Sequence, residues 1–260
     1  MSVLDAILAA TRAECARLHA ELPPPVDHRP IDVAARLSRA RAVTDVPLRL
    51  IAEIKKRSPS AGALSRALGV EQRAAVYARE GATMISVLVD RAHFDGGYDD
   101  LSRARAVTDV PLLAKGFTID DVQLEAARRA GADAVLLIAR ILDDAALRAL
   151  LAGSVARGLT PIVEVVDEQE LSRALAADAR VIGVNARDLA TLMMDRARAA
   201  RVLAAIPEGR VALWFSGVSE PAEIATLRAS RVDGALIGEA LMRHDDPAPL
   251  LRAMIDAAGR

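Results

Sequence analysis

The chain has 260 residues, of which 52% are hydrophobic and only 2% aromatic, so its core must be built from Ala, Leu, Val and Ile. Its 34 Lys and Arg residues against 35 Asp and Glu residues give a net charge of −1, which offers nucleic acid or an anionic membrane no overall attraction. A single cysteine, Cys15, rules out an internal disulfide, and the four histidines show no ligand spacing. We therefore expect a cytoplasmic protein without a metal site.

The first predicted element is an amphipathic helix near the N-terminus. A helical stripe is approximated by the apolar residues Val3, Ile7, Leu8, Ala10, Cys15 and Leu18. Charged residues interrupt the stripe, so neither a signal peptide nor a membrane-spanning helix is expected. Prolines at positions 23, 24, 25 and 30 then break the pattern. We expect residues 1–48 to form a helical extension that packs on the rest of the protein.

From residue 49 onward, short apolar runs alternate with segments of helical periodicity. The runs begin near Leu50, Met84, Pro111, Ala134, Pro161, Val181, Val211 and Ala235. From the first to the last is 235 − 50 = 185 residues over seven intervals, about 26 per unit. Such a pattern indicates parallel strands buried on both faces, and an open doubly wound sheet usually has fewer strands. Residues 49–260 are thus predicted to form an α/β fold, a (β/α)8 TIM barrel that makes one domain with the N-terminal extension.

One segment occurs twice without a mismatch. The sequence LSRARAVTDVPL is found at 37–48 and again at 101–112, and each copy leads into a predicted strand. Identity over twelve residues exceeds what shared barrel architecture requires, and a recent duplication would explain it. We attach no function to it.

Ionisable side chains interrupt several apolar runs near their ends. Glu53 and Lys55 share one side of the first strand, Lys115 closes the third, and Glu164 lies within the fifth. Asn185 ends the sixth strand. Active sites of TIM barrels lie at the carboxyl ends of the strands, where these groups would shift one another's pKa values. The alternative is a set of ordinary structural ion pairs, which is harder to reconcile with the same relative position on several strands.

Glycines after the last two strands predict a phosphate site. Ser216 and Gly217 follow the seventh strand, while Gly238 and Glu239 end the eighth and open a helix. Backbone N–H groups at such turns commonly bind phosphate in this fold. The three phenylalanines, Phe94, Phe117 and Phe215, also follow strands at this end, which favours a pocket for a flat apolar group.

These motifs resemble the indole-3-glycerol phosphate synthase family of tryptophan biosynthesis. The resemblance covers about residues 51–247 and rests on AEIKKRSPSAG (52–62), ISVLVDRAHFDGGYDDL (85–101), AKGF (114–117), ADAVLLIARIL (132–142), VEV (163–165), IGVNARDL (182–189) and LIGEALMRHDDP (236–247). It implies a carboxy-lyase that needs no cofactor. The reaction converts 1-(2-carboxyphenylamino)-1-deoxyribulose 5-phosphate into indole-3-glycerol phosphate, carbon dioxide and water. It implies a small phosphorylated substrate as the partner, and we favour a monomer.

The resemblance also implies roles for individual residues. Lys115 would be the general acid at the substrate carbonyl, and Glu164 the general base for the loss of water. Lys55 would contact the substrate carboxylate, Glu53 would orient the lysines, and Asn185 would bind the sugar hydroxyls. Phosphate would be held by Ser58, Arg187, Ser216, Gly217, Gly238 and the backbone N–H of Glu239. The aromatic ring would be walled by Phe94, Phe117, Leu136, Leu189 and Phe215.

Three positions depart from the family pattern. The usual K-D-F reads Lys115-Gly116-Phe117, Ala186 replaces a polar residue, and Phe215 replaces the glutamate of the usual A-E-S-G. Because a phenyl ring removes a charge and desolvates its neighbours, we expect Phe215 to lower the pKa of Lys115, unless Glu53 and Glu164 keep the lysine protonated. Three interpretations stay open. The chain is an active but impaired synthase, or a non-catalytic relative that binds a phosphorylated aromatic ligand or serves as an interaction subunit. The third is a different phosphate-handling barrel enzyme, such as an isomerase or a Schiff-base aldolase that uses Lys115.

Overall fold

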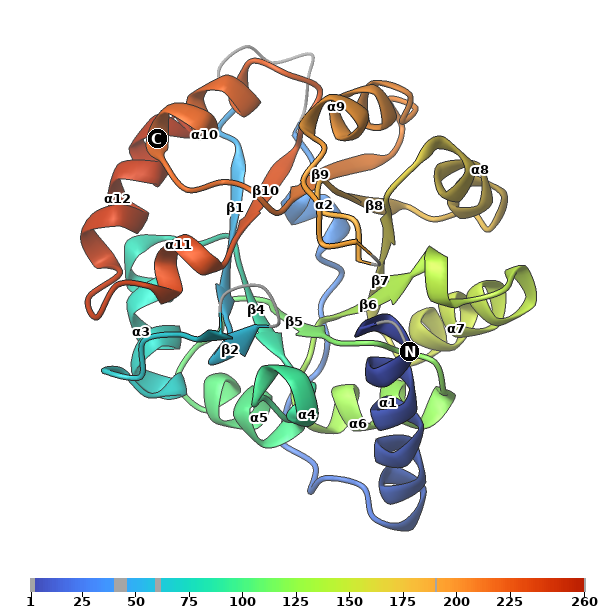
Figure 1. The fold of residues 1–260 in the computed structure, drawn as a ribbon. Coiled ribbons are helices and arrows are strands. Elements are labelled where there is room, and N and C mark those ends of the chain that lie inside the picture. Colours follow the sequence, from blue (N-terminus) through green and yellow to red (C-terminus); the bar gives the residue numbers. More distant parts are fainter. Residues whose placement is uncertain (1–2, 40–45, 59–61, 190, 260) are drawn as a thin grey trace.

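Eight parallel strands close into a barrel in the computed structural model, which describes residues 3–39, 46–58, 62–189 and 191–259 (Figure 1). Each strand begins within one residue of its predicted start, and the predicted TIM barrel is confirmed. Around the barrel, β1 pairs with both β4 and β10, which closes the ring. The strands are β1 (Arg49–Ile54), β4 (Met84–Leu88), β5 (Leu112–Lys115), β6 (Ala134–Ile138), β7 (Thr160–Val165), β8 (Val181–Asn185), β9 (Val211–Phe215) and β10 (Gly234–Ile237).

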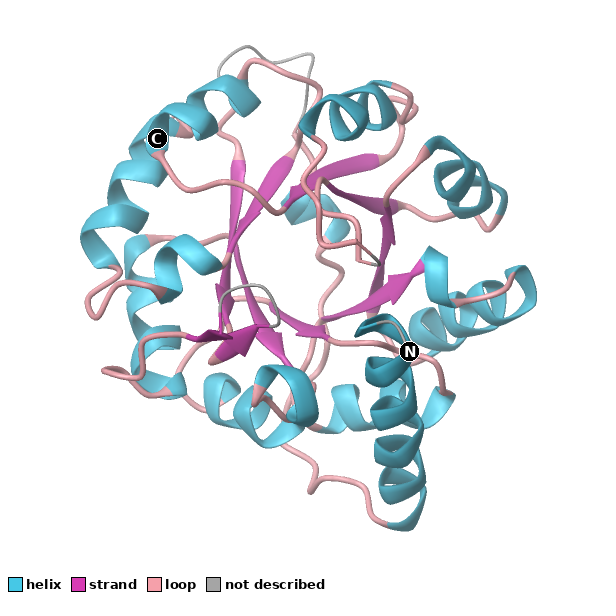
Figure 2. Ribbon diagram, in the orientation of Figure 1, coloured by secondary structure: helices cyan, strands magenta, loops and turns pink. Residues whose placement is uncertain are grey.

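Helices surround the barrel on its outside, as Figure 2 shows. Several of them begin at an aspartate that follows a strand. The carboxylates of Asp120, Asp143, Asp167 and Asp195 accept hydrogen bonds from backbone N–H groups of the first helical turn. The outer helices are α3 (Val70–Glu80), α5 (Tyr98–Arg105), α6 (Asp121–Arg129), α7 (Asp144–Ala156), α8 (Glu168–Ala176), α9 (Arg196–Ala204), α10 (Pro221–Arg228) and α12 (Ala248–Ala257).

Short elements lie in the loops at the carboxyl ends of the strands. They are the hairpin of β2 (Arg57–Ser58) and β3 (Gly62–Ala63), the helices α4 (Arg91–Phe94) and α11 (Glu239–Met242), and the 3-10 turn η1 (Ala139–Ile141). No helix in the described ranges is both long and apolar enough to cross a membrane.

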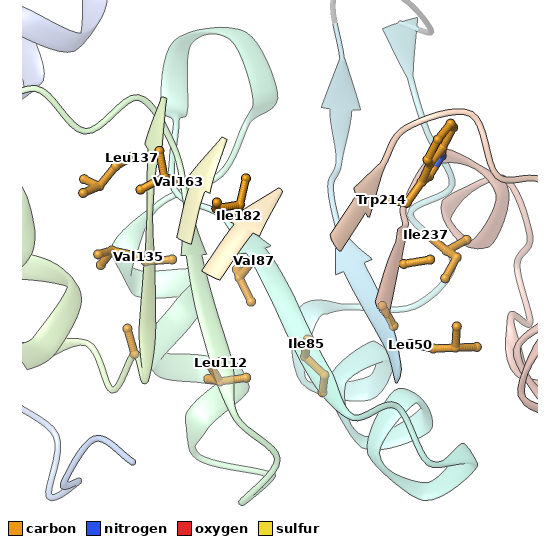
Figure 3. Packing of buried hydrophobic residues seen from close by; sticks show 14 of the residues in the cluster. Leu50, Ile85, Val87, Leu112, Val135, Leu137, Val163, Ile182, Trp214 and Ile237 are labelled. Carbon is orange, nitrogen blue, oxygen red and sulfur yellow. The ribbon is translucent and has the colours of Figure 1, made fainter. Parts of the chain in front are cut away.

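The alternation of side chains along each strand separates two apolar layers. Residues such as Leu50, Val135 and Trp214 point outward and pack against the helices (Figure 3). Their neighbours in the chain point inward, where an inner cluster contains Ile51, Leu136 and others. Near the carboxyl end of each strand, the inward positions carry the polar residues of the predicted site.

The N-terminal segment contributes to both ends of the barrel. Helix α1 (Val3–Ala20) lies across the carboxyl-terminal side, where Val3, Leu4 and Ile7 reach the mouth. Helix α2 (Ala34–Leu37) belongs to the inner apolar cluster, and the backbone N–H of Val33 binds Thr160 Oγ1 at the start of β7. Helix α2 therefore closes the opposite, amino-terminal end.

Two buried aspartates hold this amino-terminal end together in the same way. Asp133, before β6, accepts the N–H of Leu112 at 2.8 Å and an Arg105 guanidinium nitrogen at 3.1 Å. Asp233, before β10, accepts the N–H of Ala212 at 2.7 Å and Arg231 at 3.1 Å. The other carboxylate oxygen of each aspartate accepts a backbone N–H from the N-terminal segment, that of Ile31 at 3.1 Å and that of Arg39 at 3.2 Å respectively.

The two copies of the repeated segment differ in structure. In the second copy Leu101 lies within α5, which continues to Arg105. In the first copy the helix ends at Leu37, and Ser38 is extended, with φ −65° and ψ 141°. Residues 40–45 of this copy lie outside the described ranges. The conformation of this repeated sequence is therefore set by its tertiary contacts and not by its local propensity.

Candidate active site

A cavity of about 320 Å³ opens at the carboxyl ends of the strands, a size typical of small-molecule sites. Every residue predicted from the sequence to belong to the site lines it. These residues are Glu53, Lys55, Ser58, Phe94, Lys115, Phe117, Leu136, Glu164, Asn185, Arg187, Leu189, Phe215, Ser216, Gly217, Gly238 and Glu239. The fold thus brings residues from all eight barrel strands and their loops to one place.

A buried carboxylate joins two lysines in this cavity. Glu53 is 1% exposed, and its Oε1 accepts a hydrogen bond from Lys55 Nζ at 2.5 Å. Its other oxygen, Oε2, lies 3.1 Å from Lys115 Nζ. Burial acts to raise the pKa of Glu53, but the two lysines outweigh it and lower that pKa to about 2. Glu53 is therefore an anion that fixes the positions of both ammonium groups.

Lys115 is protonated at neutral pH. Burial acts to lower its pKa, but the carboxylates of Glu53 and Glu164 raise it above its ordinary value. Of the two outcomes stated for Phe215, the raised pKa favours the one in which Glu53 and Glu164 keep this lysine protonated. The two remaining carboxylates hold the charge even with an aromatic ring lining the same cavity.

Glu164 and Asn185 form a second buried pair on neighbouring strands. Asn185 Nδ2 donates a hydrogen bond to Glu164 Oε1 at 2.9 Å, and Asn185 Oδ1 accepts the backbone N–H of Arg187 at 3.0 Å. Burial raises the pKa of Glu164, and Lys115 and Asn185 only partly oppose this. The Asn185 side chain thus orients Glu164 and the following loop, an interaction that the sequence alone does not predict.

Gly238 has a structural role in addition to the predicted contact with phosphate. A Cβ atom at this position would lie 2.1 Å from Glu53 Oε1 and 3.2 Å from Lys55 Nζ. The absence of a side chain at Gly238 therefore lets the carboxylate of Glu53 sit against the backbone of the loop after β10. Glycine at this position serves the ion pair as well as any contact with phosphate.

The turn after β9 carries unusual backbone angles. Ser216 has φ 69° and Gly217 has φ 78°, so two successive residues are in the left-handed region. For a serine this conformation costs roughly 1 kcal/mol. Strain of this kind gathers at ligand-binding turns, in line with the predicted phosphate end of the cavity. Arg243 of the following loop also lines this end and pairs with Glu239 at 2.7 Å, although sequence reasoning did not single it out.

Aromatic side chains form an apolar wall of the cavity. The rings of Phe94 and Phe117 are tilted by 35° with centroids 6.1 Å apart. Phe215 is 1% exposed, and its ring packs so closely on Gly183 that a Cβ there would lie 2.5 Å from the ring. Sequence reasoning missed the contribution of Val3, Leu4 and Ile7, because nothing in the local pattern of α1 indicates which strand ends it covers.

The two smaller departures from the family pattern also have structural consequences. A Cβ on Gly116 would lie 2.8 Å from Val89 Cγ2, so a larger residue needs Val89 to move. Ala186 is completely buried, and its backbone bonds to Phe215 and Asp195. A polar side chain at position 186 would need a buried hydrogen-bond partner.

Comparison with known proteins gives a consistent family assignment. The model of the family described as "Indole-3-glycerol phosphate synthase" matches residues 4–254. The indole-3-glycerol phosphate synthase of Kineococcus radiotolerans is 40% identical over 99% of this chain and 96% of its own length. That of Mycobacteroides abscessus is 38% identical over 98% of this chain and 94% of its own length.

Solved structures with much lower identity share the fold. A thiamine phosphate pyrophosphorylase from Pyrococcus furiosus matches with a TM-score of 0.60 at 15% identity, over 81% of this chain and 95% of its own. A 3-hexulose-6-phosphate synthase from Salmonella typhimurium matches with a TM-score of 0.62 at 13% identity, over 81% and 98%. These two similarities support the barrel architecture alone.

Proposed function

The chain belongs to the indole-3-glycerol phosphate synthase family, and we propose that it catalyses the ring closure of 1-(2-carboxyphenylamino)-1-deoxyribulose 5-phosphate to indole-3-glycerol phosphate. The observation that carries this proposal is the buried carboxylate of Glu53, which contacts both Lys55 and Lys115. A structural ion pair needs one lysine. Two lysines held at the bottom of a cavity provide two proton donors for one substrate.

The proposed reaction begins with Lys115. Its ammonium group protonates the carbonyl oxygen of the ribulose chain while the ring carbon that bears the carboxylate attacks the carbonyl carbon. Carbon dioxide then leaves from that ring carbon and restores the aromatic ring. Glu164 acts as the general base in the loss of water, with Lys55 as the acid for the departing hydroxyl group.

The protonation states of these groups suit their proposed tasks. Lys115 has a raised pKa and carries its proton at neutral pH. The raised pKa of Glu164 makes it a stronger base than an exposed carboxylate. A protonated Lys115 is a poor nucleophile, which argues against a Schiff-base aldolase.

We further propose that Phe215 impairs turnover. The family's glutamate at this position would offer a carboxylate to the lysines and the substrate, and a phenyl ring offers neither charge nor hydrogen bond. Because Glu53 and Glu164 already keep Lys115 protonated, the loss acts on contacts with the substrate in the transition state. Binding persists, because the residues proposed to hold the phosphate are present and Phe215 itself belongs to the proposed wall around the aromatic ring.

Formation of fluorescent indole-3-glycerol phosphate from the synthetic substrate tests the function. Lys115→Ala and Glu164→Gln serve as controls that lower the signal. A second candidate, a binding protein without turnover, is favoured by Phe215 alone. Calorimetric binding of the substrate without any product would establish that candidate and refute the synthase.

The sequence also leads us to expect a cytoplasmic monomer. Sedimentation velocity checks the oligomeric state, and a concentration-dependent shift towards a dimer would contradict it.

A further inference from the structure

A guanidinium group near the cavity contacts three carboxylates, two at the start of α8 and one in the loop after β8. Arg140, in η1 after β6, donates Nε to Glu170 Oε1 at 2.6 Å and Nη1 to Asp188 Oδ2 at 2.6 Å. Its Nη2 reaches Asp167 Oδ2 at 3.1 Å. Neither the predicted site nor the proposed reaction uses this residue, which does not line the cavity.

The contact with Asp188 fixes the loop after β8. Asp188 Oδ1 accepts the N–H of Thr191 at 3.0 Å, and its backbone N–H and C=O bond to Met193 and Leu192. The carbonyl of Leu192 in turn accepts Arg187 Nη1 at 3.1 Å. Leu189, Leu192 and Arg187 all line the cavity, so the aspartate held by Arg140 sets one wall of it.

The contact with Glu170 fixes the end of β7. Glu170 is 6% exposed, and its second oxygen accepts the N–H of Val166 at 2.8 Å, two residues after Glu164. Asp167 accepts the backbone N–H of Glu170 and caps α8. Arg140 therefore holds the strand end that carries the proposed general base.

Arg140 also balances a charge close to Glu164. The charged groups that face Glu164 are Lys115 from β5, Glu53 from β1 and Glu170 from α8, and the amide of Asn185 faces it from β8. The negative charge of Glu170 acts on Glu164 to raise its pKa. Arg140 Nε lies 2.6 Å from Glu170 Oε1 and so compensates this negative charge.

We propose that Arg140 is a positioning residue for Glu164 and for the loop after β8, and that it acts through Glu170 and Asp188. This inference rests on the proposed function for its catalytic meaning, but the geometry on which it depends is independent of turnover. A lysine cannot replace the arginine, since one ammonium group lacks the fork that reaches three carboxylates.

The first test measures the loop without any catalysis. In Arg140→Gln, hydrogen exchange of the backbone amides of Thr191, Leu192 and Met193 should become roughly tenfold faster. Arg157→Gln is the matched control. Arg157 has a similarly buried side chain and pairs with Asp121 at 2.5 Å and Glu125 at 3.4 Å, neither of which lines the cavity. Unchanged exchange in Arg140→Gln, or equal acceleration in Arg157→Gln, overturns the proposal.

The second test measures the pKa of Glu164 directly. Carboxyl carbon NMR, assigned with Glu164→Gln, should show this pKa higher by roughly half a unit in Arg140→Gln, because the charge of Glu170 is then uncompensated. Adding Glu170→Gln should reverse the shift. Arg140→Lys should keep most of the charge balance yet release the loop. A Glu164 pKa unmoved by Arg140→Gln refutes the assigned role.

Kinetics then separates this inference from the proposed function. If the wild type forms indole-3-glycerol phosphate, Arg140→Gln should lower kcat more than it raises KM, and the acid limb of its pH profile should move up with the Glu164 pKa. A wild type without turnover refutes the synthase, while the exchange and NMR results still decide the role of Arg140.

Discussion

Substitution of Gly238 by alanine should disable the site by displacing Glu53. The added Cβ would lie 2.1 Å from Glu53 Oε1, and heavy atoms need at least 3.0 Å, so the carboxylate must shift by 3.0 − 2.1 = 0.9 Å. Lys55 Nζ would lie only 3.2 Å from the new atom. The carboxylate therefore cannot keep its contacts with both lysines unchanged.

The cost of such a shift can be estimated. A displacement of about 1 Å in a catalytic constellation lowers the rate by about a hundredfold. That corresponds to roughly 2.7 kcal/mol of activation free energy. The effect should fall on kcat, since the lysines lose their alignment. If Gly238 served only the phosphate, the same substitution would raise KM and leave kcat unchanged.

The assay is steady-state formation of indole-3-glycerol phosphate, with circular dichroism to establish that the variant is folded. Gly209→Ala provides the control, because a Cβ at Gly209 has no heavy atom within 4 Å. A folded Gly238→Ala enzyme whose kcat stays within twofold of the wild type would refute the reasoning about Glu53.

Lys115→Ala should abolish turnover yet weaken ligand binding, measured by calorimetry, by no more than about tenfold, roughly 1.4 kcal/mol. Glu164→Gln should slow turnover while ligand binding stays tight. Full activity of Lys115→Ala would rule out Lys115 as the general acid. Phe215→Glu should raise kcat at some cost in stability, because it buries a charge. The basic limb of the pH profile should move little, since Lys115 is already protonated. A folded variant with equal or lower kcat would count against impairment by Phe215. The pKa of Glu53 falls from 4.5 to about 2 on folding, so its charge should contribute on the order of 3 kcal/mol to the free energy of unfolding above pH 4.5. This contribution is lost as the pH falls towards 2. The free energy of urea unfolding should therefore depend less on pH between these values in Glu53→Gln than in the wild type.

The sequence predicted the barrel well because strands buried on both faces leave an unmistakable pattern. Runs of Val, Ile and Leu mark each strand, and the inward alternation places Glu53, Lys115 and Glu164 at one mouth. The site residues come from strand ends, whose meeting point follows from the topology alone. No comparable rule exists for the covering helix α1, whose contacts depend on the path of residues 21–48.

The interactions between the site residues could not be predicted from the sequence. The close approach of Glu53 to Gly238 depends on a backbone position in a loop that is 185 residues away in the chain. The pKa of Lys115 depends on a balance between burial and two carboxylates, and only the distances reveal which effect is larger. Nothing in the sequence distinguishes Arg140 from a surface arginine, because its partners come from helix α8 and from the loop after β8.

The paired aspartates at the amino-terminal end bear on how the barrel unfolds. Asp133 and Asp233 stand before strands four places apart in a ring of eight, and each accepts a backbone N–H from the same N-terminal segment. That segment can bind both aspartates only when opposite sides of the ring are formed. The two halves of the barrel should therefore unfold as one cooperative unit. Local opening of either half would break the contacts of the N-terminal segment, which also stabilise the other half.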